Sequence, residues 1–321
     1  MTNTSIELDE EIQETNDSDS KYFSLISRLS KQSVDKHFNA YEDVDWDAEE
    51  MQIELGKGHW TLTDGQLDPI GSTQWYQGLD DLAKDKLGLY SVAIRMKFGL
   101  QFESILKRGL LEYAFRLPNN SPEFRYAYHE VIEEAQHSLM FQEFVNRTKL
   151  DIPGLTKLDL FGTSIIVKLG AYFPALFFFF VLGGEDPIDY VQRKALRMEK
   201  EIHPLLQRIM KIHVTEEARH LSFARHYLKL NVPKLGFVRK TTLSIAVPII
   251  LGTMAQMMLQ APRQVVKEFN IPQDVLKEAY KDNELHHVET RNSLNKVRNL
   301  YEELNLMTPV SKRIWKLFNI L

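Results

Sequence analysis

Two short motifs in this sequence place carboxylate and imidazole groups on one face of a predicted helix. The first is Glu134-Ala-Gln-His137, and the second runs from His213 through Glu217 to His220. Because an α-helix turns by about 100° per residue, the named side chains of each motif project from the same side. Two such helices, with one further Glu from each of two other helices, supply the ligands of a di-iron or di-manganese site in a four-helix bundle. The spacing therefore predicts a dinuclear metal site.

Three long stretches have the periodicity of amphipathic helices that could carry these ligands. They lie at about residues 86–116, 123–147 and 204–229, and apolar residues recur in each at steps of three and four. The candidate ligands lie on these apolar stripes, where buried residues are expected. No clear strand pattern is visible. We therefore expect an all-α fold, a ferritin-like helical bundle with additional peripheral helices, whose core covers about residues 80–260.

The position of the break between the first two predicted helices indicates which carboxylate of the first helix lies beside Glu134. In an antiparallel helix pair, residues at the same height are equally distant in sequence from the connecting loop. The midpoint of Glu103 and Glu134 falls within the proline-containing break at residues 117–122, whereas the midpoint of Glu112 and Glu134 falls beyond it. Glu103 is therefore the preferred partner of Glu134. An ion pair with Lys107 is the alternative explanation of Glu103.

The same test selects Glu185 as the fourth carboxylate. The midpoint of Glu185 and Glu217 lies close to the expected break at residues 199–204. Asp186 and Asp189 remain as alternative ligands, because a proline follows closely and Asp186 could simply cap a helix that begins there.

Four buried carboxylates require positive charge nearby. Burying an unpaired carboxylate costs several kcal/mol, and two or three histidines cannot neutralise four of them at pH 7. The chain has no cysteine, so it offers a metal only oxygen and imidazole ligands, and we expect two iron ions with manganese as the alternative. Glu133 and Glu216 precede two of the candidate ligands. Each could accept the second N–H of a ligand histidine across the site, unless it lies on a solvated helix face.

The composition and the N-terminal sequence indicate which partners, location and domain organisation to expect. A net charge of −5 argues against nucleic acid as a partner. Residues 1–20 are acidic and contain no Lys or Arg, which predicts a disordered tail instead of a signal peptide, and hence a cytoplasmic protein. We expect residues 21–321 to form a single helical di-iron oxygenase domain.

Three apolar or amphipathic segments resemble membrane-binding elements. The stretch at 172–182 is too short to span a membrane and that at 243–258 contains Pro248 and polar residues, so we expect both to be buried helices. The amphipathic C-terminus, residues 312–321, would suit a membrane surface, although membrane contact is not the favoured interpretation.

The additional histidine of the second motif points to one group of di-iron proteins. Most di-iron carboxylate proteins have two histidine ligands, whereas this chain resembles the p-aminobenzoate N-oxygenase family over about residues 80–260. The resemblance implies seven metal ligands: Glu103, Glu134, His137, Glu185, His213, Glu217 and His220. It also implies an all-helical homodimer that oxidises a small aromatic amine with O₂ and an external electron donor, toward hydroxylamine, nitroso or nitro products.

Two other functions fit the same ligand set. A di-iron hydroxylase, desaturase or oxidase could act on a lipid-like or carrier-bound substrate, which the many apolar residues and the amphipathic C-terminus would suit. A non-enzymatic iron-binding protein would need the metal site but no substrate. Product analysis with arylamines and acyl chains distinguishes the three functions.

Overall fold

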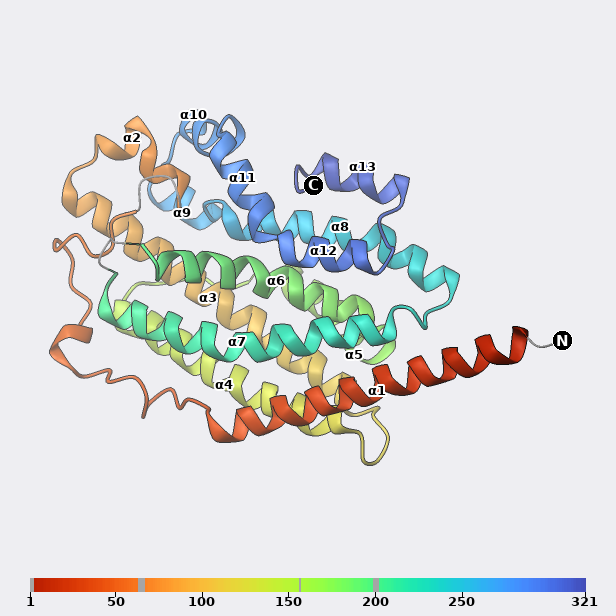
Figure 1. The fold of residues 1–321 in the computed structure, drawn as a ribbon. Helices are drawn as coiled ribbons and strands as arrows, with labels where there is room; N and C mark the ends of the chain where they lie inside the picture. The colour runs from red at the N-terminus through yellow and green to blue at the C-terminus, as the bar shows by residue number, and fades with distance from the viewer. Residues whose placement is uncertain (1–2, 63–66, 156, 199–201) are drawn as a thin grey trace.

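The structure of the chain, a computed structural model, describes residues 3–62, 67–155, 157–198 and 202–321. Within these ranges the secondary structure is helical and contains no β-strand. The all-α fold class expected from the sequence is therefore confirmed. Figure 1 shows long helices packed side by side, with shorter helices from the C-terminal part of the chain gathered over one side of them.

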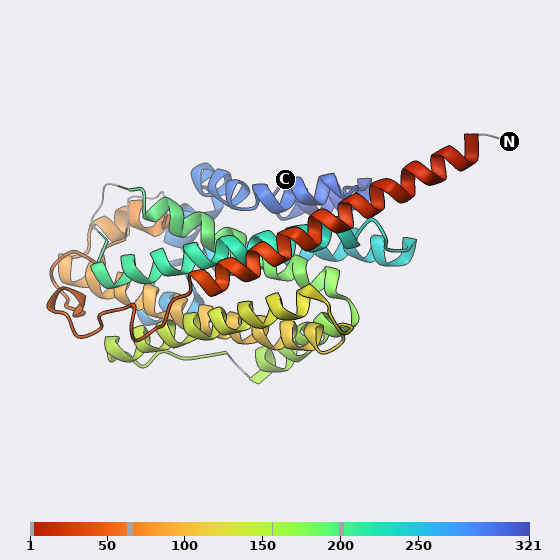
Figure 2. The same ribbon diagram turned by 60° about the horizontal axis from the view of Figure 1, so that its bottom comes forward.

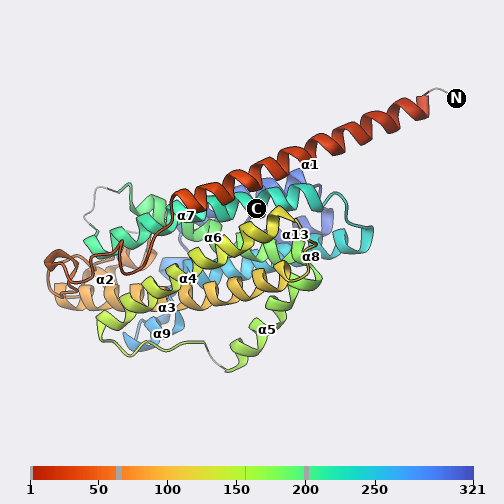
Figure 3. The same cartoon turned by 90° about the horizontal axis from the view of Figure 1, so that it is seen from below.

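Four long helices carry the candidate ligands. They are α3 (Asp81–Ala114), α4 (Pro122–Thr148), α6 (Pro174–Ala195) and α7 (Pro204–Asn231). Three of them begin with proline, whose missing N–H costs no hydrogen bond at the first helical position. α3 packs along α4, and α6 packs along α7 (Figures 1 and 3), as the two predicted helix pairs require.

Helix α6 differs from the alternative that the sequence left open, in which Asp186 caps a helix that begins at Pro187. It continues through that residue to Ala195. Proline has no N–H to donate to the carbonyl of Gly183 one turn earlier, so the hydrogen-bond ladder is interrupted close to Glu185. Tertiary packing holds the helix together, because every residue from Ala175 to Pro187 is buried. The expectation that the apolar stretch at 172–182 belongs to a buried helix is confirmed from residue 175 onward.

A polar layer divides the apolar core of the bundle into two clusters. On α4, Tyr126 and Ala127 belong to one cluster, whereas Met140 and Phe141 belong to the other. Helices α3 and α7 are divided in the same way, and the segments between the two clusters contain the candidate ligands. The predicted site therefore lies at mid-height in the bundle, with apolar packing above and below it.

Helix α1 spans Asn3–Asp35 and lies across α4 and α7, while its N-terminal part projects beyond the bundle (Figure 2). This differs from the disordered acidic tail expected for residues 1–20, of which residues 1–2 lie outside the described ones. Residues 3–35 contain neither glycine nor proline. Nothing in the sequence therefore interrupts a helix that extends from the packed turns around Tyr22 and Ile26 toward the N-terminus.

The remaining elements cover the bundle. α5 (Lys157–Tyr172) lies against α3 and α6, and α8 (Phe237–Leu259) packs along α6. The shorter elements are η1 (Glu49–Met51), η2 (Pro69–Ser72), α2 (Gln74–Gln77), α9 (Arg263–Glu268), α10 (Gln273–Leu276), η3 (Lys277–Lys281), α11 (Glu284–Ser293), α12 (Asn295–Glu303) and α13 (Pro309–Leu317).

The amphipathic C-terminus is packed onto α8. Trp315 and Ile320 are buried, and the ring of Phe318 lies over Gly252, where an added Cβ would be 2.2 Å from the ring. The apolar face of residues 312–321 is therefore largely used inside the protein. Among the described residues, one helical segment, Phe237–Glu268, is long and apolar enough to cross a membrane, and 39% of its apolar window is buried.

Candidate metal centre

The four long helices bring all seven sequence-predicted ligands together. Each side chain is at most 2% exposed. One comes from α3, two from α4, one from α6 and three from α7: Glu103, Glu134, His137, Glu185, His213, Glu217 and His220. The pairing of helices that the midpoint argument assumed is the pairing observed, so both of the carboxylates selected in that way lie inside the bundle.

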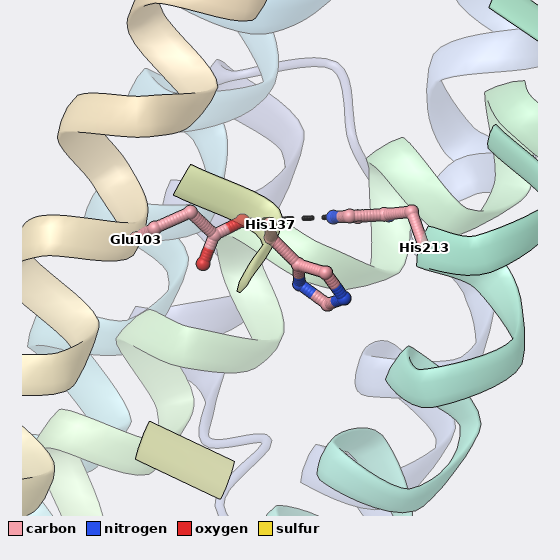
Figure 4. Close-up of side chains that lie close together, drawn as sticks. All are labelled: Glu103, His137 and His213. Carbon is pink, nitrogen blue, oxygen red and sulfur yellow. Dashed lines mark ion pairs between the residues drawn. The ribbon is translucent and has the colours of Figure 1, made fainter. Parts of the chain in front are cut away.

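The candidate ligands form overlapping groups of three residues. The three ligand atoms of each group all lie within 4.8 Å of one another. One group joins Glu103, His137 and His213, which converge from three helices in Figure 4. Two more contain Glu217, once with Glu134 and His137 and once with Glu185 and His213. Shared members connect these groups into one site, large enough to offer ligands to more than one cation.

The histidine rings present different nitrogens to the carboxylates. His137 Nδ1 lies 3.1 Å from Glu134 Oε2, and His220 Nδ1 lies 3.1 Å from Glu217 Oε1. His213 instead turns Nε2 inward, 3.5 Å from Glu103 Oε1, while its Nδ1 lies 3.0 Å from the side-chain oxygen of Gln192. Each ring therefore has one nitrogen facing the carboxylates and the other held by a polar partner.

Two further carboxylates hold the outer nitrogens of His137 and His220 in a crossed arrangement. His137 Nε2 lies 2.9 Å from Glu216 Oε2 on α7, and His220 Nε2 lies 2.7 Å from Glu133 Oε2 on α4. This confirms the prediction that these two glutamates support histidines across the site. Arg219 connects them, with Nη2 2.7 Å from Glu133 Oε1 and 3.5 Å from Glu216 Oε1. The arrangement fixes both ring orientations before any ion binds.

The alternative carboxylates of α6 have other partners. Asp186 pairs with Arg225 of α7, and Asp189 pairs with Arg193 at 2.6 Å and with Lys296 of α12 at 3.6 Å. Their charges are thus already compensated. Glu185 is the α6 carboxylate that joins the His213 group.

An ion pair with Lys107 was the alternative explanation of the buried Glu103, and the structure shows where both side chains lie. The Lys107 amine donates to the backbone oxygen of Glu134, at 3.0 Å, and to the Ser138 hydroxyl. Glu103 Oε1 lies 3.5 Å from His213 Nε2. The Lys107 amine therefore bridges α3 to α4, while Glu103 faces the histidines.

Glu130 is a buried carboxylate of the site that sequence reasoning missed. It is 1% exposed and lies in a group with Glu134 and His220. Burial raises the pKa of Glu130 to about 8. Its position one helical turn before Glu134 is the signal that could have found it, because residues four apart share a helix face. Gln192, the partner of His213, had no comparable signal.

The charge distribution of the site fits bound cations. Burial, followed by repulsion from neighbouring carboxylates, raises the pKa values of Glu103 and Glu185 well above the ordinary range and also raises that of Glu217. Glu103 Oε2, Glu130 Oε2 and Glu217 Oε2 are buried and have no hydrogen-bond partner among the described residues. Buried, unpartnered carboxylate oxygens are costly without a counter-charge. Two metal ions held by these residues would supply that charge.

Replacing Glu216 with alanine is expected to weaken Fe²⁺ binding by about 10- to 100-fold. The physical reason is that His137 loses the acceptor that lies 2.9 Å from its Nε2 and holds its ring orientation. Competition with a calibrated chelator measures the affinity. Glu143→Ala removes a carboxylate from the same bundle outside the site, where Glu143 pairs with Arg147 at 2.8 Å, and should bind Fe²⁺ as the unmodified protein does. Equal affinities for both variants would contradict the positioning role of Glu216.

Comparison with known proteins gives a family that agrees with this geometry. The family model described as p-aminobenzoate N-oxygenase AurF matches residues 19–305. The uncharacterised proteins Mb0909 of Mycobacterium bovis and Rv0885 of Mycobacterium tuberculosis are each 36% identical over 302 residues, which covers 94% of this chain and 88% of each relative. No solved structure matches. The match extends well beyond the ligand motifs into the peripheral helices, and the chain belongs to the p-aminobenzoate N-oxygenase AurF family.

Proposed function

We propose that this protein is a di-iron oxygenase that oxidises the nitrogen of an aromatic amine. The observation that carries the proposal is the convergence of four carboxylates and three imidazoles from four helices at one buried site. The family match supports it, because the family is named for N-oxygenation of p-aminobenzoate. We assign the iron-ligand role to the seven residues predicted from the sequence.

Two iron ions bound at this site would supply the redox chemistry of O₂ activation. The chain's own part is to hold and shield them. Glu134 and Glu217 are the carboxylates that belong to two ligand groups each, and they would help to hold the ions. Glu133, Glu216 and Arg219 keep the ring orientations of His137 and His220. Apolar clusters on both sides exclude water from the layer that contains the ligands.

Aromatic side chains border the proposed iron site. The ring of Phe141 lies 5.4 Å from the His213 ring and 6.4 Å from the His137 ring, measured between centroids. Gly99 provides the space for Phe141, since an added Cβ there would lie 3.1 Å from the phenyl ring. Such aromatic surroundings suit the flat ring of an aromatic amine.

Electrons are proposed to come from a separate donor. The chain contains no cysteine, so it has no thiolate ligands for an iron–sulfur cluster of its own. A reductase or a chemical reductant would then bind or react at the protein surface. The homodimer implied by the family resemblance stays a prediction, as does cytoplasmic residence.

The test is a turnover assay with iron-loaded protein, O₂, a reductant and a panel of aromatic amines including p-aminobenzoate. The proposal expects hydroxylamine, nitroso or nitro products that depend on iron and O₂, detected by chromatography and mass spectrometry. Oxidised acyl chains, formed instead when fatty acyl substrates are supplied, would favour the hydroxylase or desaturase alternative. Stoichiometric iron without any product from either panel would favour an iron-binding protein, and both of these results would overturn N-oxygenation.

A further inference from the structure

Eight large hydrophobic side chains are exposed on helices α5 and α8, with exposed fractions between 41% and 84%. They are Phe161, Ile165, Tyr172, Phe237, Val238, Ile245, Ile249 and Met257. We call this surface the α5–α8 face. The sequence predicted that residues 243–258 form a buried helix, and the structure corrects this for one side of α8. Clustered exposed apolar side chains of this kind mark an interaction surface.

The two sides of helix α8 differ in burial. Leu243, Val247, Leu251 and Ala255 are fully buried in the core cluster shared with α6. At about 100° per residue, Val238, Ile245 and Ile249 fall within about 40° of one another on the opposite side. The helix is therefore anchored in the protein along one side and presents an apolar strip along the other, which is the geometry of a helix that lies on a surface and does not cross a membrane.

Neighbouring helices border this strip on two sides. The Arg239 guanidinium lies 5.5 Å from the ring centroid of Phe173, which follows the end of α5. Gly252 lies within about 20° of Ile245 around α8, and Phe318 at the end of α13 covers it, so α13 closes the C-terminal end of the exposed strip. The apolar strip of α8 thus runs from a contact with the end of α5 to the packed end of α13.

The charge of these three helices is one-sided. Helices α5, α8 and α13 together contain one acidic residue, Asp159, although the whole chain has 44 acidic and 39 basic residues. They carry seven basic residues, and the six whose side chains the structure describes are all at least partly exposed: Lys168, Arg239, Lys240, Lys312, Arg313 and Lys316. An acidic protein therefore concentrates unbalanced positive charge around its exposed apolar strip.

We propose that the α5–α8 face docks on an anionic lipid surface. Apolar side chains would enter the interface between headgroups and acyl chains, while the flanking bases attract acidic headgroups, and each base near the surface adds to the attraction. A second copy of the chain fits less well, because a two-fold symmetric contact would bring two sets of the same bases together. The inference rests on α5, α8 and α13 alone and is independent of the proposed chemistry.

The experiment is co-sedimentation of the full-length, iron-loaded protein with vesicles. One vesicle preparation contains phosphatidylcholine and phosphatidylglycerol, and the other contains phosphatidylcholine alone. We expect at least about tenfold stronger partitioning onto the anionic vesicles, lost progressively with added salt. The triple variant K312Q/R313Q/K316Q should reduce the partition coefficient by about tenfold or more, since three of the seven bases are removed. It is expected to keep the fold because all three side chains are exposed.

A matched pair of variants tests the apolar strip. Ile249→Glu places a charge on α8 at a residue that is 43% exposed, and Leu82→Glu places the same charge on the first turn of α3 at a residue that is 45% exposed. Ile249→Glu should abolish vesicle binding, whereas Leu82→Glu should retain it, with unchanged iron content and circular dichroism in both. Equal partitioning onto neutral and anionic vesicles, or unchanged binding by the triple variant, overturns the proposal. So does a dimer in sedimentation velocity that Ile249→Glu dissociates, since it assigns the face to a second copy.

Discussion

Replacing either Glu134 or Glu217 with glutamine is expected to remove both iron ions from the protein. These two side chains occupy the middle of the proposed site. Glu134 groups with Glu130 and His220 as well as with His137 and Glu217, and Glu217 also groups with Glu185 and His213. Because each carboxylate belongs to two ligand groups, we expect the loss of its charge to weaken the binding of both ions. We expect metal analysis by mass spectrometry to find well below one iron per chain, and iron-dependent turnover to fall at least about 100-fold.

The matched control for this experiment is Glu143→Gln. Glu143 lies on α4, as Glu134 does, but it pairs with Arg147 at the protein surface. Loss of a surface ion pair costs about 1 kcal/mol at most. The control should therefore fold and bind iron fully. Two irons per chain in both glutamine variants would show that the proposed ligand set is wrong, whatever the variants do to activity.

The faces of individual helices could be predicted from the sequence because helix geometry is local. The periodicity of α4 and α7 placed Glu134, His137 and Glu217 on their apolar sides, and all three are buried in the structure. The sequence also predicted which helices pack against each other. The prolines at residues 117–122 mark one turn between helices, and equal distances from the turns then selected Glu103 and Glu185, which the structure brings to the same site.

Contacts between residues far apart in the sequence could not be predicted in this way. Asp186 and Glu185 are adjacent, and the structure separates them through the pairing of Asp186 with Arg225 on α7. No local pattern encodes that pairing. The continuation of α6 through Pro187 is likewise a tertiary effect, because burial on all sides of the helix outweighs the lost hydrogen bond.

The surface of the molecule was less predictable than its core. Hydropathy alone suggested that residues 243–258 were buried, since an apolar helix is normally a core helix. Exposure depends on how many neighbours pack around a helix, and α8 packs mainly against α6 and α13. The side of α8 that carries Ile245 and Ile249 is left exposed for this reason.

Removing iron is expected to lower the melting temperature of the protein by about 10 °C. A ligand present at about 1,000 times its dissociation constant stabilises the folded state by about 4 kcal/mol, and a chain of this size melts about 2 to 4 °C lower for each kcal/mol lost. Without cations, the buried carboxylates repel one another or take up protons. Calorimetry on the iron-loaded protein and on protein treated with a chelator measures the difference.

The stability of the iron-loaded protein and that of the metal-free protein should change with pH in opposite directions. In the metal-free protein, burial raises the pKa of Glu130 to about 8 and raises those of Glu103, Glu185 and Glu217, so the folded state binds more protons than the unfolded state. Burial alone would lower the pKa of His137, but its hydrogen bonds to Glu134 and Glu216 raise it to about 9, which acts in the same direction. Stability from these groups is lost as the pH rises through their folded-state pKa values.

Four histidines act in the opposite direction, since burial lowers the pKa values of His129, His203 and His213 and lowers that of His286 to about 4. The effect of these histidines is complete once the pH exceeds their unfolded-state pKa of about 6.5, so the melting temperature of the metal-free protein should fall between about pH 7 and about pH 8. The iron-loaded protein should become more stable over the same range, because metal ligands must be deprotonated to bind. The control is apo Glu143→Gln, which should follow the metal-free curve of the unmodified protein. Parallel pH curves for the loaded and metal-free forms would mean that the buried carboxylates do not hold the metal, since binding would then release no protons.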